Sequence, residues 1–231
     1  MASMKCPNCS AEFEPRSVPI FGKQYFTQKR CDFCIEETSA RERLEREQAE
    51  AEAIAARKAE QWSKICPLDY RAIDLKKLPA RAQQSLPQIL SWRYNPIGLL
   101  VGGETGAGKT RCVYRLLKQV FDCGLTIEAH SPLSFRASVV KAAMGGGGLE
   151  DWVYRASKAD VFYFDDLGQM RLTESSEEAL FELVERRCAN QKPILATTQY
   201  QNEIFVAQFI RPERGSAIAR RLMEFCEFIE L

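Results

Sequence analysis

The sequence predicts an α/β protein: a three-layer domain around a five-stranded parallel sheet, preceded by a small cysteine-containing module and a charged helix. Three observations predict it. From about residue 97 onward, apolar runs of strand length alternate with segments of helical periodicity. The first of these runs leads through a glycine-rich loop into a helix. Before residue 66, paired cysteines are followed by a segment rich in Ala, Glu and Arg.

Length and charge limit the possible functions. A chain of 231 residues is enough for one medium domain and a small appendage. The net charge of +1 requires neither nucleic acid nor membrane as a partner. No apolar run approaches the roughly 20 residues that span a bilayer. Because the opening MASMKCPNCS lacks the apolar core of a signal peptide, we expect a cytoplasmic protein with no membrane partner.

Four of the nine cysteines form two pairs, Cys6-x-x-Cys9 and Cys31-x-x-Cys34. Each pair places two thiols on one tight turn, and two such turns complete the tetrahedral site of a zinc ribbon. Residues 1–35 are therefore predicted to fold around a structural Zn²⁺, because so short a segment has little core of its own. Two redox C-x-x-C sites are the alternative, disfavoured because neither pair is expected to open a helix as in thioredoxin-like proteins.

Residues 36–65 are predicted to form a solvated helix between this module and the main domain. The segment EETSARERLEREQAEAEAIAARKAEQW contains no Gly or Pro, and Glu37 with Arg41 has the favoured i,i+4 orientation. We expect a spacer; a docking surface for a partner helix is the alternative. A linker with four prolines, from Pro67 to Pro96, leads into the first strand.

The segment GLLVGGETGAGKTR, Gly98 to Arg111, has the G-x-x-x-x-G-K-T spacing of a phosphate-binding loop between a strand and a helix. Its glycines let successive N–H groups point at an anion beside the positive end of the new helix. Lys109 would reach the β- and γ-phosphates, and the Thr110 hydroxyl would complete the shell of a Mg²⁺ ion. A glycine turn that binds nothing is the alternative. The predicted nucleotide-binding residues are Gly103, Glu104, Thr105, Gly106, Ala107, Gly108, Lys109, Thr110 and Arg111.

The nucleotide is expected to be ATP, since the sequence has no N-K-x-D segment that would read guanine. Four aromatic side chains upstream of the loop are available to cover the adenine base: Trp62, Tyr70, Trp92 and Tyr94. Aromatic residues that only pack in the core are the more common alternative.

An apolar run over residues 159–166 ends in two acids, Asp165 and Asp166. It predicts a strand that places Asp165 beside the Mg²⁺, held through water, and Asp166 where it polarises the attacking water. A strand capped by solvated acids is the alternative. The next helix contains Ser175 and Glu178 at the spacing of a capping box.

Residues 193–199 form the next predicted strand, and Gln199 or Thr198 at its carboxyl end could contact the γ-phosphate or its water. Residues 126–130 and 225–231 supply the remaining strands.

The series GGETGAGKT, VFYFDDLG, ILATTQ and GSAIARRLMEFCEFIEL resembles AAA+ ATPases of the DnaC/DnaI helicase-loader and IstB transposition-helper group. The resemblance covers residues 66–231 and implies a P-loop AAA+ domain without a C-terminal lid. It assigns Lys109 and Thr110 to Walker A and Asp165 to the metal side of Walker B. Asp166 stands where many of these proteins have Glu, and Gln199 falls at the sensor-1 position.

Arg221 falls on the residue that looks like the arginine finger of this group, which reaches the nucleotide of a neighbouring copy. The adjacent Arg220 is the alternative by one step of register.

The resemblance implies an ATPase that loads the replicative hexameric helicase onto single-stranded DNA, as a homo-oligomer on the DNA or on the helicase. The zinc module would grip the helicase. Basic residues that flank the Gly145–Gly148 run would contact the DNA backbone: Arg136, Lys141, Arg155 and Lys158. Two alternatives stay open, an IstB-like transposition helper and a nucleotide-gated adaptor with negligible turnover.

Overall fold

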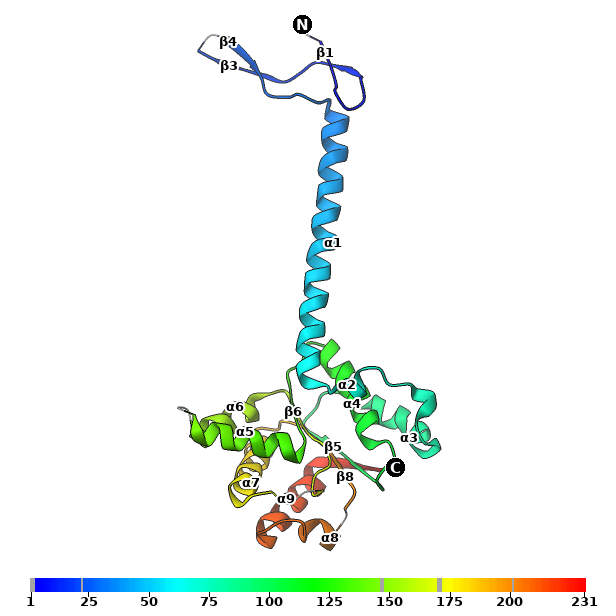
Figure 1. The fold of residues 1–231 in the computed structure, drawn as a ribbon, viewed down its shortest axis with the longest axis vertical. Helices are drawn as coiled ribbons and strands as arrows, with labels where there is room; N and C mark the ends of the chain where they lie inside the picture. The colour runs from blue at the N-terminus through cyan, green and yellow to red at the C-terminus, as the bar shows by residue number, and fades with distance from the viewer. Residues whose placement is uncertain (1–2, 22, 146–147, 170–171, 201) are drawn as a thin grey trace. The chain divides into compact units, whose positions relative to one another are not determined.

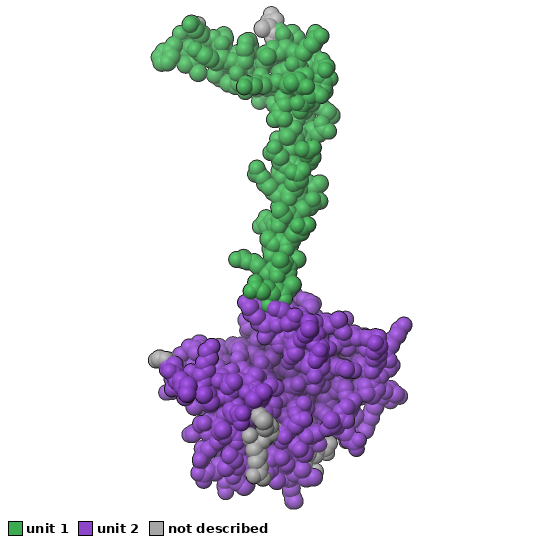
Figure 2. All heavy atoms as spheres, viewed as in Figure 1, with its two compact units in different colours: residues 1–60 green, residues 61–231 purple. Residues whose placement is uncertain are grey.

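The computed structural model describes residues 3–21, 23–145, 148–169, 172–200 and 202–231. The chain divides into two compact units, residues 1–60 and residues 61–231 (Figure 2). No helix within the described ranges combines the length and the apolar character that crossing a membrane would need.

The first unit contains two short hairpins and most of a long helix. β1 (Met4–Lys5) pairs with β2 (Glu12–Phe13), and β3 (Ser17–Ile20) pairs with β4 (Lys23–Phe26), both antiparallel. α1 (Asp32–Ile65) follows, and its side chains within this unit are mostly exposed. Arg41 contacts Glu45 at 3.3 Å rather than the predicted Glu37, a surface pair that contributes little stability.

The second unit is a three-layer α/β domain, which confirms the predicted fold class (Figure 1). Five parallel strands are arranged in the order β6-β7-β8-β5-β9. Their bounds are β5 (Gly98–Gly102), β6 (Ile127–His130), β7 (Val161–Phe164), β8 (Ile194–Thr198) and β9 (Cys226–Glu230). The three central strands are buried along their whole length, which explains their nearly continuous apolar runs.

Helices cover both faces of the sheet (Figure 1). Leu99 and Val101 of β5 belong to one core, and Leu100 belongs to the other, as the alternation of a strand requires. The first core includes the last turn of α1 together with α3 (Ala80–Ser91) and α4 (Lys109–Asp122). The second core is formed by α5 (Pro132–Met144), α6 (Gly148–Lys158), α7 (Glu174–Ala189), α8 (Asn202–Val206) and α9 (Pro212–Phe225).

The proline-containing segment over residues 66–96, predicted as a linker, is instead largely helical. It contains α2 (Leu68–Arg71), the 3-10 helix η1 (Leu75–Lys77) and α3. Pro87 lies inside α3 and cannot donate a backbone hydrogen bond there. The helix forms because its apolar face, including Leu86 and Ile89, is buried in the first core.

The cap of α7 also differs from the prediction. Thr173, not Ser175, caps this helix by accepting a hydrogen bond from the Ser176 N–H at 3.3 Å. Both side chains suit an N-cap, so composition alone could not decide which residue begins the helix.

A buried arginine on α7 forms hydrogen bonds to the ends of three other elements, α6, β7 and β8. Arg187 is fully buried, and burial lowers the pKa of its guanidinium to about 10. No carboxylate pairs with it among the described residues; it donates to backbone carbonyls at the ends of α6, β7 and β8 instead. These are the carbonyls of Ala156 (3.4 Å), Ser157 (3.2 Å), Ala159 (2.9 Å), Asp160 (3.0 Å) and Pro193 (2.7 Å).

We expect Arg187→Met to lower the free energy of unfolding by about 3 kcal/mol or more, because it leaves several buried carbonyls without a donor. The adjacent Arg186→Met is the matched control. Arg186 pairs with Glu182 at the surface, and its loss should cost at most about 1 kcal/mol. Urea denaturation of the two variants measures the difference, and equal losses would contradict the structural role of Arg187.

Candidate functional site

The loop between β5 and α4 has the backbone conformation of an anion-binding nest. Gly103, Gly106 and Gly108 have φ values of 143°, 83° and 94°, which side-chain-bearing residues rarely adopt. At Gly103 a Cβ would also lie 2.5 Å from the carbonyl oxygen of Leu231. The predicted need for glycine at these positions is therefore confirmed by conformation, and at Gly103 by close approach as well.

Lys109 is the first residue of α4, and its side chain reaches back to the start of this loop. Its Nζ donates to the carbonyl oxygens of Gly103 and Glu104, each at 2.9 Å. The side chain is buried, and burial lowers the pKa of the ammonium, while Asp166 and Asp165 act in the opposite direction. The loop thus holds a cation among backbone dipoles, an arrangement that fits the phosphates of a nucleotide.

The carboxylate of Asp165 is the centre of a hydroxyl network. Its Oδ1 accepts hydrogen bonds from Thr110 Oγ1 at 2.9 Å, Tyr163 OH at 2.6 Å and Thr197 Oγ1 at 2.7 Å. Burial, followed by the charge of Asp165, raises the pKa of Tyr163, so this phenol stays a neutral donor. The predicted metal-side pair, Thr110 and Asp165, is therefore in direct contact across elements that are 55 positions apart.

Asp166 follows in a left-handed backbone conformation, with φ of 50°. Its N–H donates to Thr197 Oγ1 at 2.7 Å. Burial, then the charge of Asp165, raises the pKa of the Asp166 carboxyl, while Lys109 lowers it. Thr197 therefore links the two acids: it donates to the side chain of one and accepts from the backbone of the other.

Thr197 and Tyr163 both contact Asp165, and neither was among the residues predicted for the site. The prediction named the neighbours of Thr197, and they face elsewhere: Thr198 Oγ1 donates to the Leu167 carbonyl at 2.9 Å, and Gln199 Oε1 accepts from Thr105 Oγ1 at 2.6 Å. Gln199 is thus joined to the phosphate loop. Only the alternation of β8, which shows which threonine lies toward Asp165, could have identified Thr197.

A cavity of about 550 Å³ opens beside the loop. Of the four aromatic candidates for the adenine base, Tyr70 lines it, whereas Trp62 and Trp92 are buried in the first core. Tyr94 lies against Lys192, whose Nζ donates to the phenol oxygen at 3.3 Å. The lining residues are Asp69, Tyr70, Thr105, Gly106, Gly108, Lys109, Thr110, Arg111, Asp166 and Gln169.

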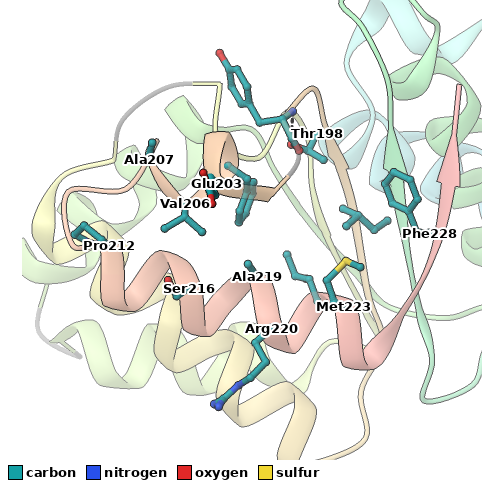
Figure 3. Close-up of a pocket in the computed structure, with 14 residues that line it drawn as sticks. Thr198, Glu203, Val206, Ala207, Pro212, Ser216, Ala219, Arg220, Met223 and Phe228 are labelled. Carbon is teal, nitrogen blue, oxygen red and sulfur yellow. Dashed lines mark hydrogen bonds between the residues drawn. The ribbon is translucent and has the colours of Figure 1, made fainter.

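A larger hollow of about 700 Å³ lies on the face of the sheet that is covered by the second core (Figure 3). Val206, Met223 and Phe228 point into it, and its lining is mostly apolar. Arg220 is the one cation among its described lining residues, and its guanidinium points away from the hollow (Figure 3). No glycine is found among those described residues either, so a nucleotide fits the smaller cavity better despite its size.

The two candidate finger arginines of α9 differ in their surroundings. Arg221 forms a two-point ion pair with Glu185, at 2.7 Å and 2.8 Å, and lies 3.5 Å from Glu224. Arg220 is exposed at the rim of the apolar hollow, and its guanidinium points away from it (Figure 3).

The candidate DNA-contacting residues lie on α5 and α6. Arg136 and Lys141 belong to α5. On α6, Arg155 pairs with Asp151, and the Lys158 ammonium lies 4.8 Å from the centre of the Tyr154 ring. Gly146 and Gly147 of the glycine run lie outside the described residues.

The four paired cysteines of the first unit converge as predicted. Their sulfur atoms all lie within 4.8 Å of one another. The second pair does open a helix, α1, contrary to the expectation; convergence of four thiols, rather than helix position, is what favours a metal over redox chemistry. A hydrogen bond from the Cys31 N–H, 3.4 Å long, is the main cause that lowers the pKa of Cys6 to about 6, which favours a thiolate ligand.

The parallel sheet, the glycine nest and the Thr110–Asp165 contact together define a P-loop protein of the AAA+ class. The chain belongs to the family of IstB-like ATP-binding proteins, whose sequence model matches residues 25–231. Among curated proteins, none matches this sequence significantly.

Solved structures with the same fold include initiators and loaders of replication. The DnaC helicase loader has a TM-score of 0.53 at 19% identity, covering 74% of this chain and 98% of that one. DnaI has a TM-score of 0.54 at 16% identity, covering 74% of this chain and 93% of that one. DnaA from Aquifex aeolicus, bound to AMPPCP, has a TM-score of 0.52 at 14% identity over 65% of this chain. The match spans 45% of the DnaA chain, and at these identities the likeness establishes the fold alone.

We expect the purified protein to contain about one zinc per chain, because four thiols fill a tetrahedral shell. Cys34→Ser should remove most of the metal. Cys123→Ser, which changes an exposed cysteine outside the cluster, should retain it. Metal analysis of the two variants decides, and equal zinc content in both would contradict the site.

Proposed function

We propose that this protein is an ATPase that loads a replicative hexameric helicase onto single-stranded DNA. The observation that carries the proposal is the contact of Thr110 with Asp165 beside the Lys109 nest, an arrangement that suits a metal-bound triphosphate. Family membership supports ATP as the ligand. The loader role is proposed by analogy with the DnaC helicase loader, a structure of the same fold that is matched over 98% of its chain.

In this proposal, separate residues bind the phosphates, hold the metal ion and orient the attacking water. Lys109 and the loop N–H groups bind the β- and γ-phosphates, and Thr110 with Asp165 would hold Mg²⁺. When bound, this ion neutralises charge that develops on the phosphate oxygens. Asp166 would orient the attacking water, and Gln199, which accepts a hydrogen bond from Thr105 of the loop, would sense the γ-phosphate. Thr197 and Tyr163 are positioning residues, since they act through Asp165.

The three segments have separate roles in this proposal. Residues 66–231 bind and hydrolyse ATP, residues 36–65 are a spacer helix, and residues 1–35 are a zinc ribbon that grips the helicase. Arg136 and Lys141 contact the DNA backbone with Arg155 and Lys158. A protein with these partners works in the cytoplasm.

A transposition helper that gathers a transposase on duplex DNA is the second candidate, and the family match favours it. An adaptor that binds ATP without turnover is the third.

We further propose that the domain acts as a homo-oligomer in which α9 supplies an arginine to a neighbour's nucleotide. Arg221 occupies the expected position but is held by Glu185. Arg220 carries no such partner among the described contacts, so it is the better placed of the two.

Arg220→Ala should lower the ATPase rate by about 10³-fold without weakening ATP binding, because a finger acts only in the transition state. Arg221→Ala should leave most of the rate, since its ion pair is within one chain. Steady-state hydrolysis at saturating protein, together with calorimetric ATP binding, measures both effects. The reverse ranking would assign the finger to Arg221, and an unchanged rate in both variants would contradict a finger on α9.

Loading is tested with the full chain, a hexameric replicative helicase and circular single-stranded DNA. ATP should drive the helicase onto the circle, as seen by gel filtration, and Lys109→Ala should abolish this together with ATP binding. Lys118→Ala is the control, because Lys118 lies on the same helix and pairs with Asp122 at the surface. Retention of a transposase on duplex DNA instead would favour the helper, and ATP binding with neither activity would favour the adaptor.

A further inference from the structure

The β3–β4 hairpin of the first unit presents an unusual surface. All eight residues of its two strands are exposed, so neither face of this small sheet is covered within the unit. Three aromatic rings are among the exposed side chains: Phe21 at the tip is 103% exposed, Tyr25 50% and Phe26 49%. A two-stranded hairpin is marginal in water without a covered face, and exposed apolar patches are often contact sites for a partner.

The charge of this segment has a single sign. Residues 15–31 contain Arg16, Lys23, Lys29 and Arg30 and no acidic residue, although the whole chain is nearly neutral. Arg16 lies 3.4 Å from Asp32. Within the described part of the chain, Lys23 and Lys29 form no ion pair, so both ammonium groups are available to an anion.

The register places rings and charges together. Val18 is paired with Tyr25, and Ile20 is paired with Lys23, so these four side chains share one face of the hairpin. Phe26 lies on the opposite face and Phe21 at the tip. The Tyr25 ring is thus two residues from the Lys23 ammonium group on the same face of β4. A ring beside a positive charge suits a polymer of flat bases and phosphates.

We propose that residues 17–21 and 23–26 with Lys29 form a binding site for single-stranded nucleic acid, in which Phe21 and Tyr25 stack on bases and Lys23 and Lys29 contact phosphates. A protein partner would also cover the apolar face, but it would not require a run of four positive charges and no negative one. The site lies in the first unit and is separate from the candidate DNA contacts on α5 and α6. It therefore goes beyond the proposed ATPase function and does not depend on it.

The experiment uses the full, zinc-loaded chain carrying Lys109→Ala and a fluorescent oligothymidine, without nucleotide. Phe21→Ala with Tyr25→Ala should weaken binding by about tenfold or more, because each stacked base is worth at least severalfold in affinity. Tyr25→Phe keeps the ring and should stay within about twofold. Phe33→Ala, an exposed aromatic on α1 outside the hairpin, should have no effect.

Charge is tested separately, because a ring variant could disturb the module. Lys23→Gln with Lys29→Gln should reduce the slope of log affinity against log salt by about 1.4, since each lost phosphate contact on a single strand removes about 0.7. Zinc content is measured for every variant. If the ring variant loses its metal, the salt slope of the Lys23→Gln with Lys29→Gln variant tests the proposal instead.

Unchanged affinity and salt slope in the hairpin variants, with a loss in Arg136→Ala/Lys141→Ala, would overturn the hairpin site while leaving strand binding by the ATPase domain intact. Hairpin variants that keep strand affinity but no longer retain the helicase would identify a protein surface instead, which also overturns the proposal.

Discussion

The pairing of β5 with β8 is the constraint on which the candidate site depends. These strands are far apart in the sequence, yet they lie side by side from Leu99↔Leu195 to Gly102↔Thr198. Because they are parallel, the phosphate loop after β5 begins at the same edge where β8 ends. β7 pairs with the other side of β8 and brings Asp165 to that edge. Open α/β sheets bind ligands at the carboxyl ends of their strands for this reason.

The polar groups at that edge support one another. Thr197 contacts both acids, Tyr163 donates to Asp165 from within the core, and Gln199 is tied to Thr105. The Asp165 carboxylate accepts hydrogen bonds from three hydroxyl groups, which hold it in one orientation without a ligand. Such preorganisation suits a site that stabilises charge as it develops during phosphoryl transfer. Arg187, at the opposite ends of β7 and β8, stabilises the same pair of strands by binding the backbone around them.

The two units differ in what holds them together. The AAA+ domain has apolar cores on both faces of its sheet, whereas the buried side chains of the first unit gather around the cysteines. A module with so little core would depend on a metal held by its four thiols, and it leaves apolar side chains at its surface. Its exposed rings, and the lysines that form no ion pair with any described residue, therefore suit contact with a partner better than a role in stability.

The sequence by itself determined the parallel α/β class, the glycine nest with Lys109, and the four-thiol cluster, because spacing along the chain encodes each of them locally. It also identified Asp165 and Thr110 as one site. Only the tertiary structure decided that Thr197 links the acids, that Tyr70 alone of four aromatics lines the cavity, and that Arg221 is held by Glu185. These outcomes depend on strand register and on which helix face packs inward, and neither is encoded in the local spacing of residues. The helical structure of residues 66–96 was not predicted for the same reason, since burial of α3 outweighs the cost of Pro87.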